Sequence, residues 1–170
     1  MEPAGEFVLR FVAAGDAGDV TRAAEFVSYP VSVLTPSMNV TIADDLDLGQ
    51  VLEATRQGRE AAGITSFQYE LVSVAQTGGH VATVIMETRR LGAGDEDLGT
   101  HQTTFVLDAT SNGWKVCSLT VTDQLDSEAD HRPIRGAFLT TFRSIFNAVI
   151  RPGRGPMQRT IYHAMAGSRH

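Results

Sequence analysis

The residues of this chain that are best suited to acid–base chemistry are His101, Glu87 and Tyr29. His101 lies in a strand-like run in which Thr103, Phe105 and Leu107 follow at alternate positions. Its imidazole is a group that exchanges protons near neutral pH. Coupled to Glu87 of the neighbouring run, or to Tyr29, it would form an acid–base pair for a dehydration, a cyclisation or an isomerisation. The alternative is a histidine at the end of a strand that hydrogen-bonds to the surface.

Glu87 and Tyr29 each have a second interpretation. Glu87 lies within an apolar run, so an inward-pointing carboxylate would be a candidate base. Otherwise it forms an ion pair with Arg89 or Arg90 at the edge of a sheet. Tyr29 is expected near the mouth of a pocket, where a phenol can fill space and donate a hydrogen bond, or else in the core as a packing residue.

Further polar and aromatic residues around these three would supply the few directional contacts that small-molecule pockets use. The expected ligand-binding set comprises Thr35, Gln102, Thr103, Thr120, Thr122 and Trp114. The ligand itself is expected to be small and largely apolar.

No metal and no cofactor is expected. Asp44, Asp45 and Asp47 crowd one loop, but their spacing lacks the glycine and the terminal glutamate of an EF-hand, and Asp47 suits the N-cap of a helix. The remaining histidines show no spacing typical of zinc. The chain also has no phosphate-binding glycine loop and no nucleophile elbow.

Charge is distributed unevenly along the 170 residues. Residues 1–130 hold all 20 acids and seven bases, whereas residues 131–170 hold seven arginines and no acid. A basic segment of this kind can bind nucleic acid, but it can equally lie on its own acidic body or on that of a partner subunit. Nucleic-acid binding is disfavoured because the body is acidic and the tail offers few aromatic residues for stacking.

The composition predicts one domain and a location in the cytoplasm. With 42% hydrophobic residues the chain can form a proper core. The N-terminus lacks the basic start and apolar core of a secretory signal, and no apolar stretch approaches the roughly 18 residues of a membrane span. The single cysteine, Cys117, is expected to be an inert core thiol.

The pattern of elements predicts helices first and a sheet second. Helices are expected over 6–14, over 19–26 with Asp19 as the N-cap, and over 48–62, with short strands over 31–34 and 39–42. Four strand-length runs then follow, each separated by a glycine-containing turn, so that an antiparallel meander is expected. These runs are 66–75, 80–90, 100–108 and 114–122.

The second of these runs is apolar on both of its faces, so both faces of the sheet need a cover. Helices can cover one face, and a second subunit is the economical cover for the other. We therefore expect a homodimer that forms through the outer face of the sheet.

This order of elements, with Tyr29-Pro30 before the first strand and Trp114 at the start of the last, resembles the nuclear transport factor 2-like superfamily over about residues 6–123. That superfamily includes polyketide cyclase-like proteins, ketosteroid isomerases and scytalone dehydratases. The resemblance implies an α+β fold in which a curved antiparallel sheet wraps around helices to form a cone with an internal pocket.

The resemblance also bears on activity. Ketosteroid isomerases carry a carboxylate just before a proline after the first strand, and that position is Thr35 here, which cannot act as a base near neutral pH. An isomerase of that mechanism is disfavoured. If the protein is an enzyme, we expect a cofactor-independent lyase or isomerase.

The one domain, residues 1–125, is expected to form the cone. Residues 126–170 are expected to form a basic, amphipathic helical C-terminal extension, with apolar residues at helical spacing between 138 and 149. The main functional hypothesis is a small-molecule-binding cone protein that acts as a cyclase-, dehydratase- or isomerase-like enzyme. The alternative is a non-catalytic dimerisation or protein-interaction module whose basic tail recruits a partner.

Overall fold

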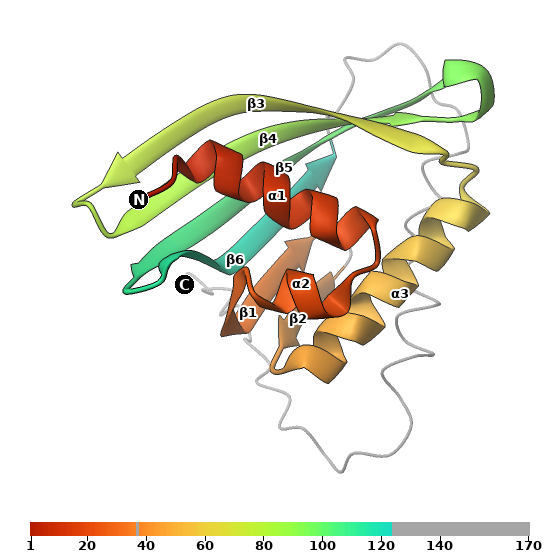
Figure 1. The fold of residues 1–170 in the computed structure, drawn as a ribbon. Coiled ribbons are helices and arrows are strands. Elements are labelled where there is room, and N and C mark those ends of the chain that lie inside the picture. The colour runs from red at the N-terminus through yellow and green to blue at the C-terminus, as the bar shows by residue number, and fades with distance from the viewer. Residues whose placement is uncertain (37, 124–170) are drawn as a thin grey trace, which may run out of the picture.

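The structure is a computed structural model that describes residues 1–36 and 38–123 (Figure 1). The expected C-terminal extension, 126–170, lies outside the described residues. The helices are α1 (Ala4–Asp16), α2 (Val20–Ala24) and α3 (Asp45–Ala61), with a short 3-10 turn, η1 (Ala93–Asp95). The strands are β1 (Val27–Thr35), β2 (Met38–Ile42), β3 (Ser66–Thr77), β4 (Val81–Leu91), β5 (Asp97–Thr110) and β6 (Gly113–Asp123).

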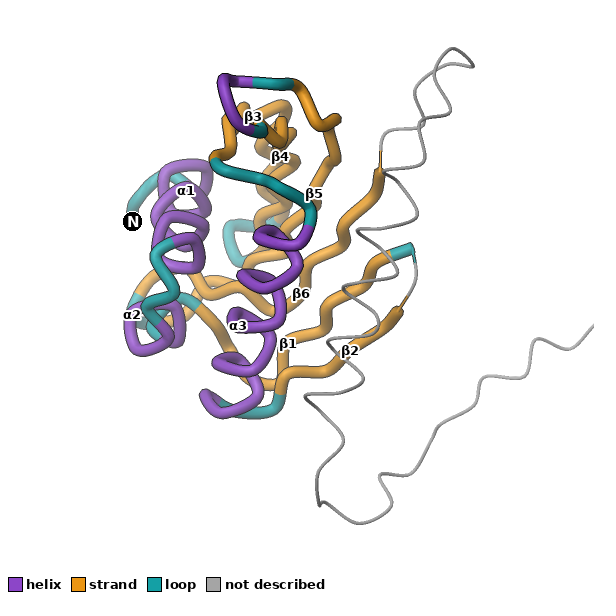
Figure 2. Tube along the Cα trace, turned by 90° about the vertical axis from the view of Figure 1, so that its right-hand side faces the viewer, coloured by secondary structure: helices purple, strands orange, loops and turns teal. Residues whose placement is uncertain are grey.

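The six strands form one curved sheet in the order β2-β1-β6-β5-β4-β3, and the helices lie on its concave side (Figures 1 and 2). The predicted meander is confirmed, because β3, β4, β5 and β6 pair in succession and antiparallel. One pairing that the turn pattern did not predict joins β1 to β6 in parallel. The predicted α+β fold with a curved sheet around helices is therefore confirmed.

The helix boundaries follow from local capping. The side chain of Asp19 accepts a hydrogen bond from the backbone N–H of Arg22 at 3.0 Å, as expected for the N-cap of α2. For α3 the expectation was wrong by three residues: Asp44, not Asp47, is the N-cap, and it accepts from the backbone N–H of Asp47 at 3.0 Å. Asp47 in turn accepts from the backbone N–H of Ala43 at 3.0 Å. These two carboxylates thus satisfy amides at the start of α3.

Two other boundaries differ from the sequence-based prediction. The first helix was expected to end at residue 14, but Gly15 still lies within α1, and the chain turns instead at Gly18, which has a φ of +68°. The first strand was expected to begin at residue 31, but β1 begins at Val27 and includes Pro30.

Two β-bulges explain why the strand alternation is imperfect in the sequence. The β3–β4 register shifts between Leu71 and Ser73, so Leu71 and Val74 both align with residues of β4 that face the core. The β5–β6 register shifts between Val106 and Leu107, which leaves Cys117 in the bulge. There the Cys117 Sγ donates to the Val106 carbonyl at 3.3 Å, and burial raises the pKa of the thiol.

The core lies between the concave face of the sheet and the helices. Its fully buried side chains from the meander include Ala82, Val84, Phe105, Leu107 and Val116. Phe11 of α1 packs edge-on against Phe105 with ring centroids 6.2 Å apart, which anchors that helix across the middle of the sheet. Among the residues that the structure describes, no helix combines the length and apolar character that crossing a membrane requires.

Candidate functional site

The most polar part of the concave face is a row of side chains from neighbouring strands. Tyr69 of β3 pairs with Thr88 of β4, and Thr88 pairs with His101 of β5. Residues that are directly opposite in a sheet share a face, so these three side chains lie side by side. We call Tyr69, Thr88 and His101 the polar row. The next positions toward the core, Met86 and Thr103, already belong to the buried interior.

Thr88 is the least expected member of this row. It is 3% exposed, and its Oγ1 has no hydrogen-bond partner within residues 1–36 and 38–123. A buried hydroxyl without a partner is unfavourable by about 1–3 kcal/mol. Such groups are rare in folded proteins and call for a specific explanation.

Tyr69 connects the polar row to two helices. Its hydroxyl donates a hydrogen bond to the Asp16 carboxylate at the end of α1. Arg59 of α3 donates to the same carboxylate, with Nη1 2.9 Å from Oδ1. The Arg59 guanidinium also lies 5.3 Å from the ring centroid of Phe67. Burial, followed by the contact with Asp16, raises the pKa of the Tyr69 phenol above its ordinary range.

Sequence reasoning missed Tyr69, Asp16, Arg59 and Thr88. Tyr69 is 53 positions from Asp16, and Arg59 is 43 positions from it, so no local spacing could reveal this cluster. The one signal in the sequence was the alternation along this strand, which places Tyr69 on the same face as Phe67 and Leu71.

The register of β4 and β5 does not place Glu87 opposite His101. Glu87 pairs with Gln102 in the ladder, one position away from the pair of Thr88 with His101. Because successive side chains of a strand point to opposite faces, Glu87 and Gln102 lie on the outer face while His101 lies on the inner one.

Of the predicted ligand-binding residues on β5 and β6, only one threonine lies on the inner face. Thr103, 6% exposed, shares the face of His101. Thr120 pairs with Thr104 and Thr122 pairs with Gln102, so both lie on the outer face. Thr35 is the last residue of β1, and its alternation with Val33 places it on the inner face.

Tyr29 lies at a different end of the cone from the polar row. Burial raises the pKa of its phenol above the ordinary range, and the Asp45 carboxylate adds to this shift. The hydroxyl lies near Asp45 without a hydrogen bond of regular geometry in the described part of the chain. Asp45 begins α3, whereas Arg59, which reaches the polar row, is 14 residues further along, or about 20 Å of helix. The structure therefore does not bring Tyr29 and His101 together.

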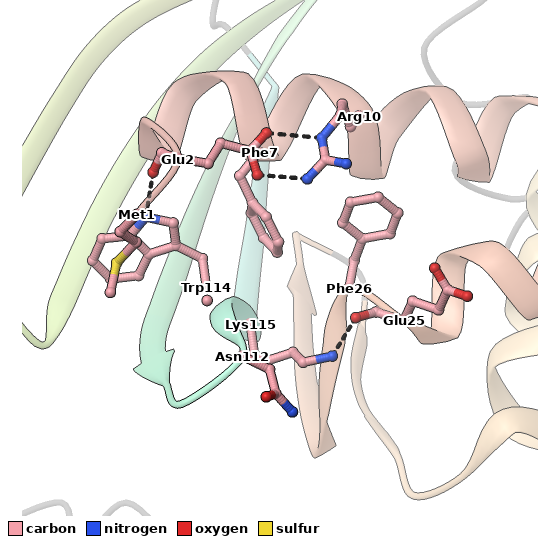
Figure 3. Close-up of a pocket in the computed structure, with 10 residues that line it drawn as sticks. Met1, Glu2, Phe7, Arg10, Glu25, Phe26, Asn112, Trp114 and Lys115 are labelled. Carbon is pink, nitrogen blue, oxygen red and sulfur yellow. Dashed lines mark hydrogen bonds and ion pairs between the residues drawn. The ribbon is translucent and has the colours of Figure 1, made fainter.

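Trp114 also lies away from the polar row, beside a pocket of about 380 Å³ at the end of the molecule where α1 begins (Figure 3). Its indole Nε1 donates to the Glu2 carbonyl at 3.0 Å. Arg10 of α1, Phe26 after α2 and Lys115 of β6 line the same pocket. Trp114 thus lines this pocket and lies apart from the side chains of the polar row.

Residues 5–124 match the family described as NTF2-like protein (DUF6841), in which NTF2 stands for nuclear transport factor 2. The chain belongs to this NTF2-like family. The expected resemblance is thereby confirmed over residues 5–124. No curated protein matches the chain.

Solved structures similar to this NTF2-like protein share its fold at low sequence identity. A protein of unknown function from Mycobacterium tuberculosis aligns with a TM-score of 0.62 at 10% identity, over 85% of this chain and 87% of that one. A ketosteroid isomerase-like protein from Erwinia carotovora atroseptica aligns with a TM-score of 0.55 at 15% identity, over 71% and 92%. A putative calcium/calmodulin-dependent protein kinase type II association domain from Thiobacillus denitrificans gives 0.55 at 17%, over 72% and 98%.

Proposed function

We propose that this NTF2-like protein binds a small molecule against the inner face of its sheet, with the polar row holding the polar part of the ligand. The observation that carries this proposal is the buried Thr88 hydroxyl, which has no partner in the described residues. A ligand that supplies a hydrogen bond would remove the cost of leaving this group unpaired.

The surroundings of Thr88 define the kind of ligand. Met86 and Phe105, on the core side of the row, are apolar and buried. Tyr69 and His101 flank Thr88 with groups that can donate or accept hydrogen bonds. An apolar body with one hydroxyl or carbonyl group fits this combination, as in most small-molecule sites.

As a finer proposal, His101 transfers a proton to or from the bound ligand in a cofactor-independent lyase or isomerase reaction. The imidazole is suited to this role near neutral pH, and Asp16 with Tyr69 would orient the polar end of the ligand. The name of the ketosteroid isomerase-like relative supports such a reaction class. Glu87, on the outer face, has no place in this reaction, and neither does Thr35 as a base.

The test of the proposal is the variant Thr88→Val, which keeps the shape of the side chain and removes its hydroxyl. Because that hydroxyl is unpaired, the variant is expected to gain about 1 kcal/mol in free energy of unfolding. It is also expected to bind 2-naphthol, an apolar ring system with one hydroxyl, about fivefold more weakly in isothermal titration calorimetry.

The control is Thr104→Val, which makes the same change on the outer face of β5. It is expected to leave 2-naphthol binding unchanged. Equal affinity for 2-naphthol in Thr88→Val and Thr104→Val would contradict the proposed role of the polar row. The variant His101→Ala distinguishes ligand binding from catalysis. Loss of turnover with retained binding would identify His101 as the proton-transfer residue.

We also propose that the protein forms a homodimer through the outer face of the sheet. Val81 is 40% exposed on that face, and Ile85 and Val106 accompany it on β4 and β5. The association domain among the similar structures supports this use of the fold. The dimer would also serve the alternative function, a non-catalytic interaction module.

A further inference from the structure

The pocket of Figure 3 is separate from the polar row. It is formed by three parts of the chain: Phe7 and Arg10 of α1, Phe26 after α2, and Trp114 and Lys115 at the start of β6. Trp114 pairs with Ala109, which is eight residues along β5 from His101. Eight residues of extended strand span about 26 Å. A ligand in this pocket would therefore not contact the polar row.

Of the two side-chain cations that line this pocket, Arg10 already has an anionic partner. The Arg10 guanidinium donates to both oxygens of the Glu2 carboxylate, and the distance from Arg10 Nε to Glu2 Oε1 is 2.8 Å. It also lies 5.3 Å from the ring centroid of Phe26. The bidentate geometry of this pair holds the Arg10 guanidinium in place, so Arg10 is not the expected partner of a ligand.

Lys115, the only lysine of the chain, is the cation that lacks an anionic partner in the described residues. Its ammonium donates to the backbone carbonyl of Glu25, and the carboxylate of Glu25 points to the other side (Figure 3). Asp108, its partner in the ladder, makes no ion pair with it. An ammonium has three N–H donors, so two remain for a ligand.

The floor of the pocket is aromatic. Phe7, Phe26 and Trp114 are each at most 5% exposed, and the rings of Phe7 and Phe26 lie 5.3 Å apart. The Trp114 N–H is already bonded to the Glu2 carbonyl. Among the lining side chains, charge recognition of an anion therefore falls to Lys115, while the rings supply apolar contact.

We propose that this pocket binds a small organic carboxylate whose charge pairs with Lys115 and whose apolar body rests against Phe7 and Phe26. The volume of about 380 Å³ is sufficient for a single-ring acid. Glu2 already neutralises Arg10, so among the described residues that line the pocket Lys115 is the side-chain cation left for a ligand, and a monoanion is favoured over a dianion.

The fluorescence of Trp114, the only tryptophan, gives a direct readout at the pocket. Titration of the full chain with benzoate is expected to give a saturable change. Benzyl alcohol, the uncharged analogue, is expected to bind about tenfold more weakly, because it lacks the charge-assisted hydrogen bond. Lys115→Gln should weaken benzoate binding by about the same factor and leave benzyl alcohol unaffected.

Arg56→Gln is the matched control, because it removes a cation from the exposed surface of α3, outside the pocket. This variant is expected to bind benzoate as the wild type does. A second measurement uses the wild type alone. Benzoate should slow reductive methylation of the single lysine side chain in proportion to the fraction of pockets that it occupies. The proposal is overturned if benzoate gives no saturable change, if Lys115→Gln binds it with unchanged affinity, or if methylation of Lys115 is not slowed.

Discussion

At the scale of single residues, the chemistry of this protein depends on which face of the sheet a side chain occupies. Glu87 and His101 lie in strands that the sequence predicts to be adjacent, but the register places their side chains on opposite faces of the sheet. Tyr69, by contrast, meets Asp16 across 53 positions of the chain. A difference of one position in register exchanges one face for the other, which is why such pairs are sensitive to the register of the ladder.

The Tyr69 phenol is expected to make stability depend on alkaline pH. Its folded-state pKa is raised above the ordinary value of 10.0. The fold therefore favours the neutral phenol, and this contribution is fully present below about pH 10 and is lost as the pH rises above it. The free energy of unfolding should fall more steeply above pH 10 in the wild type than in Tyr69→Phe, as measured by urea denaturation at a series of pH values.

At neutral pH the same variant loses the hydrogen bond to Asp16. We expect Tyr69→Phe to lower the free energy of unfolding by about 1 kcal/mol. Identical pH profiles for the two proteins would show that Tyr69 does not contribute to the alkaline loss of stability. Tyr29, whose pKa is raised too, accounts for the dependence that remains in the variant.

At the scale of elements, one side chain from α3 joins that helix to α1 and to β3. Arg59 bonds to Asp16 of α1 and lies over Phe67 of β3, so it joins three elements. Its side chain is only 16% exposed. Arg56, one turn earlier in the helix, pairs with Glu53 and Glu60 of α3 itself and is 48% exposed.

These two arginines predict different costs for the same substitution. Arg59→Gln is expected to lower the free energy of unfolding by about 1–2 kcal/mol, since it removes a half-buried ion pair and a cation–π contact between elements. Arg56→Gln, on the exposed surface of the same helix, should lower the free energy of unfolding much less, because solvent screens its ion pairs. Chemical denaturation of both variants measures the difference, and equal costs would mean that Arg59 does not join α1 to α3.

At the scale of the whole molecule, the helices cover one face of the sheet and the proposed dimer covers the other. Ile85 lies on the outer face of β4, opposite Thr104. A charge introduced there would be buried in the dimer without a partner, which is strongly unfavourable.

Ile85→Arg is therefore expected to shift the molecular mass in solution from dimer to monomer, as measured by light scattering after size exclusion. Leu9→Arg is the control, because Leu9 is 38% exposed on α1, in the layer of helices. It should leave the mass unchanged. A wild-type mass equal to one chain at all concentrations would contradict the proposed dimer.

Sequence alone determined the order of the elements and most of the meander. Turns such as the one that ends at Gly113, with a φ of +103°, require glycine, so glycines mark the ends of strands in the amino-acid sequence. Capping is equally local, and Asp19 could be identified because its partner is three residues away. The nuclear transport factor 2-like fold follows from this local information.

Only the tertiary structure decided which residues meet. The bulges at Leu71/Ser73 and Val106/Leu107 change the face of every side chain beyond them, and no single residue type marks a bulge. The parallel pairing of β1 with β6, and the cluster of Asp16, Arg59 and Tyr69, bring together segments that are far apart in the chain. Local propensities act over a few residues, whereas a binding site is built from contacts across the whole core. The residues of the site could therefore be identified only once the register of the sheet was known.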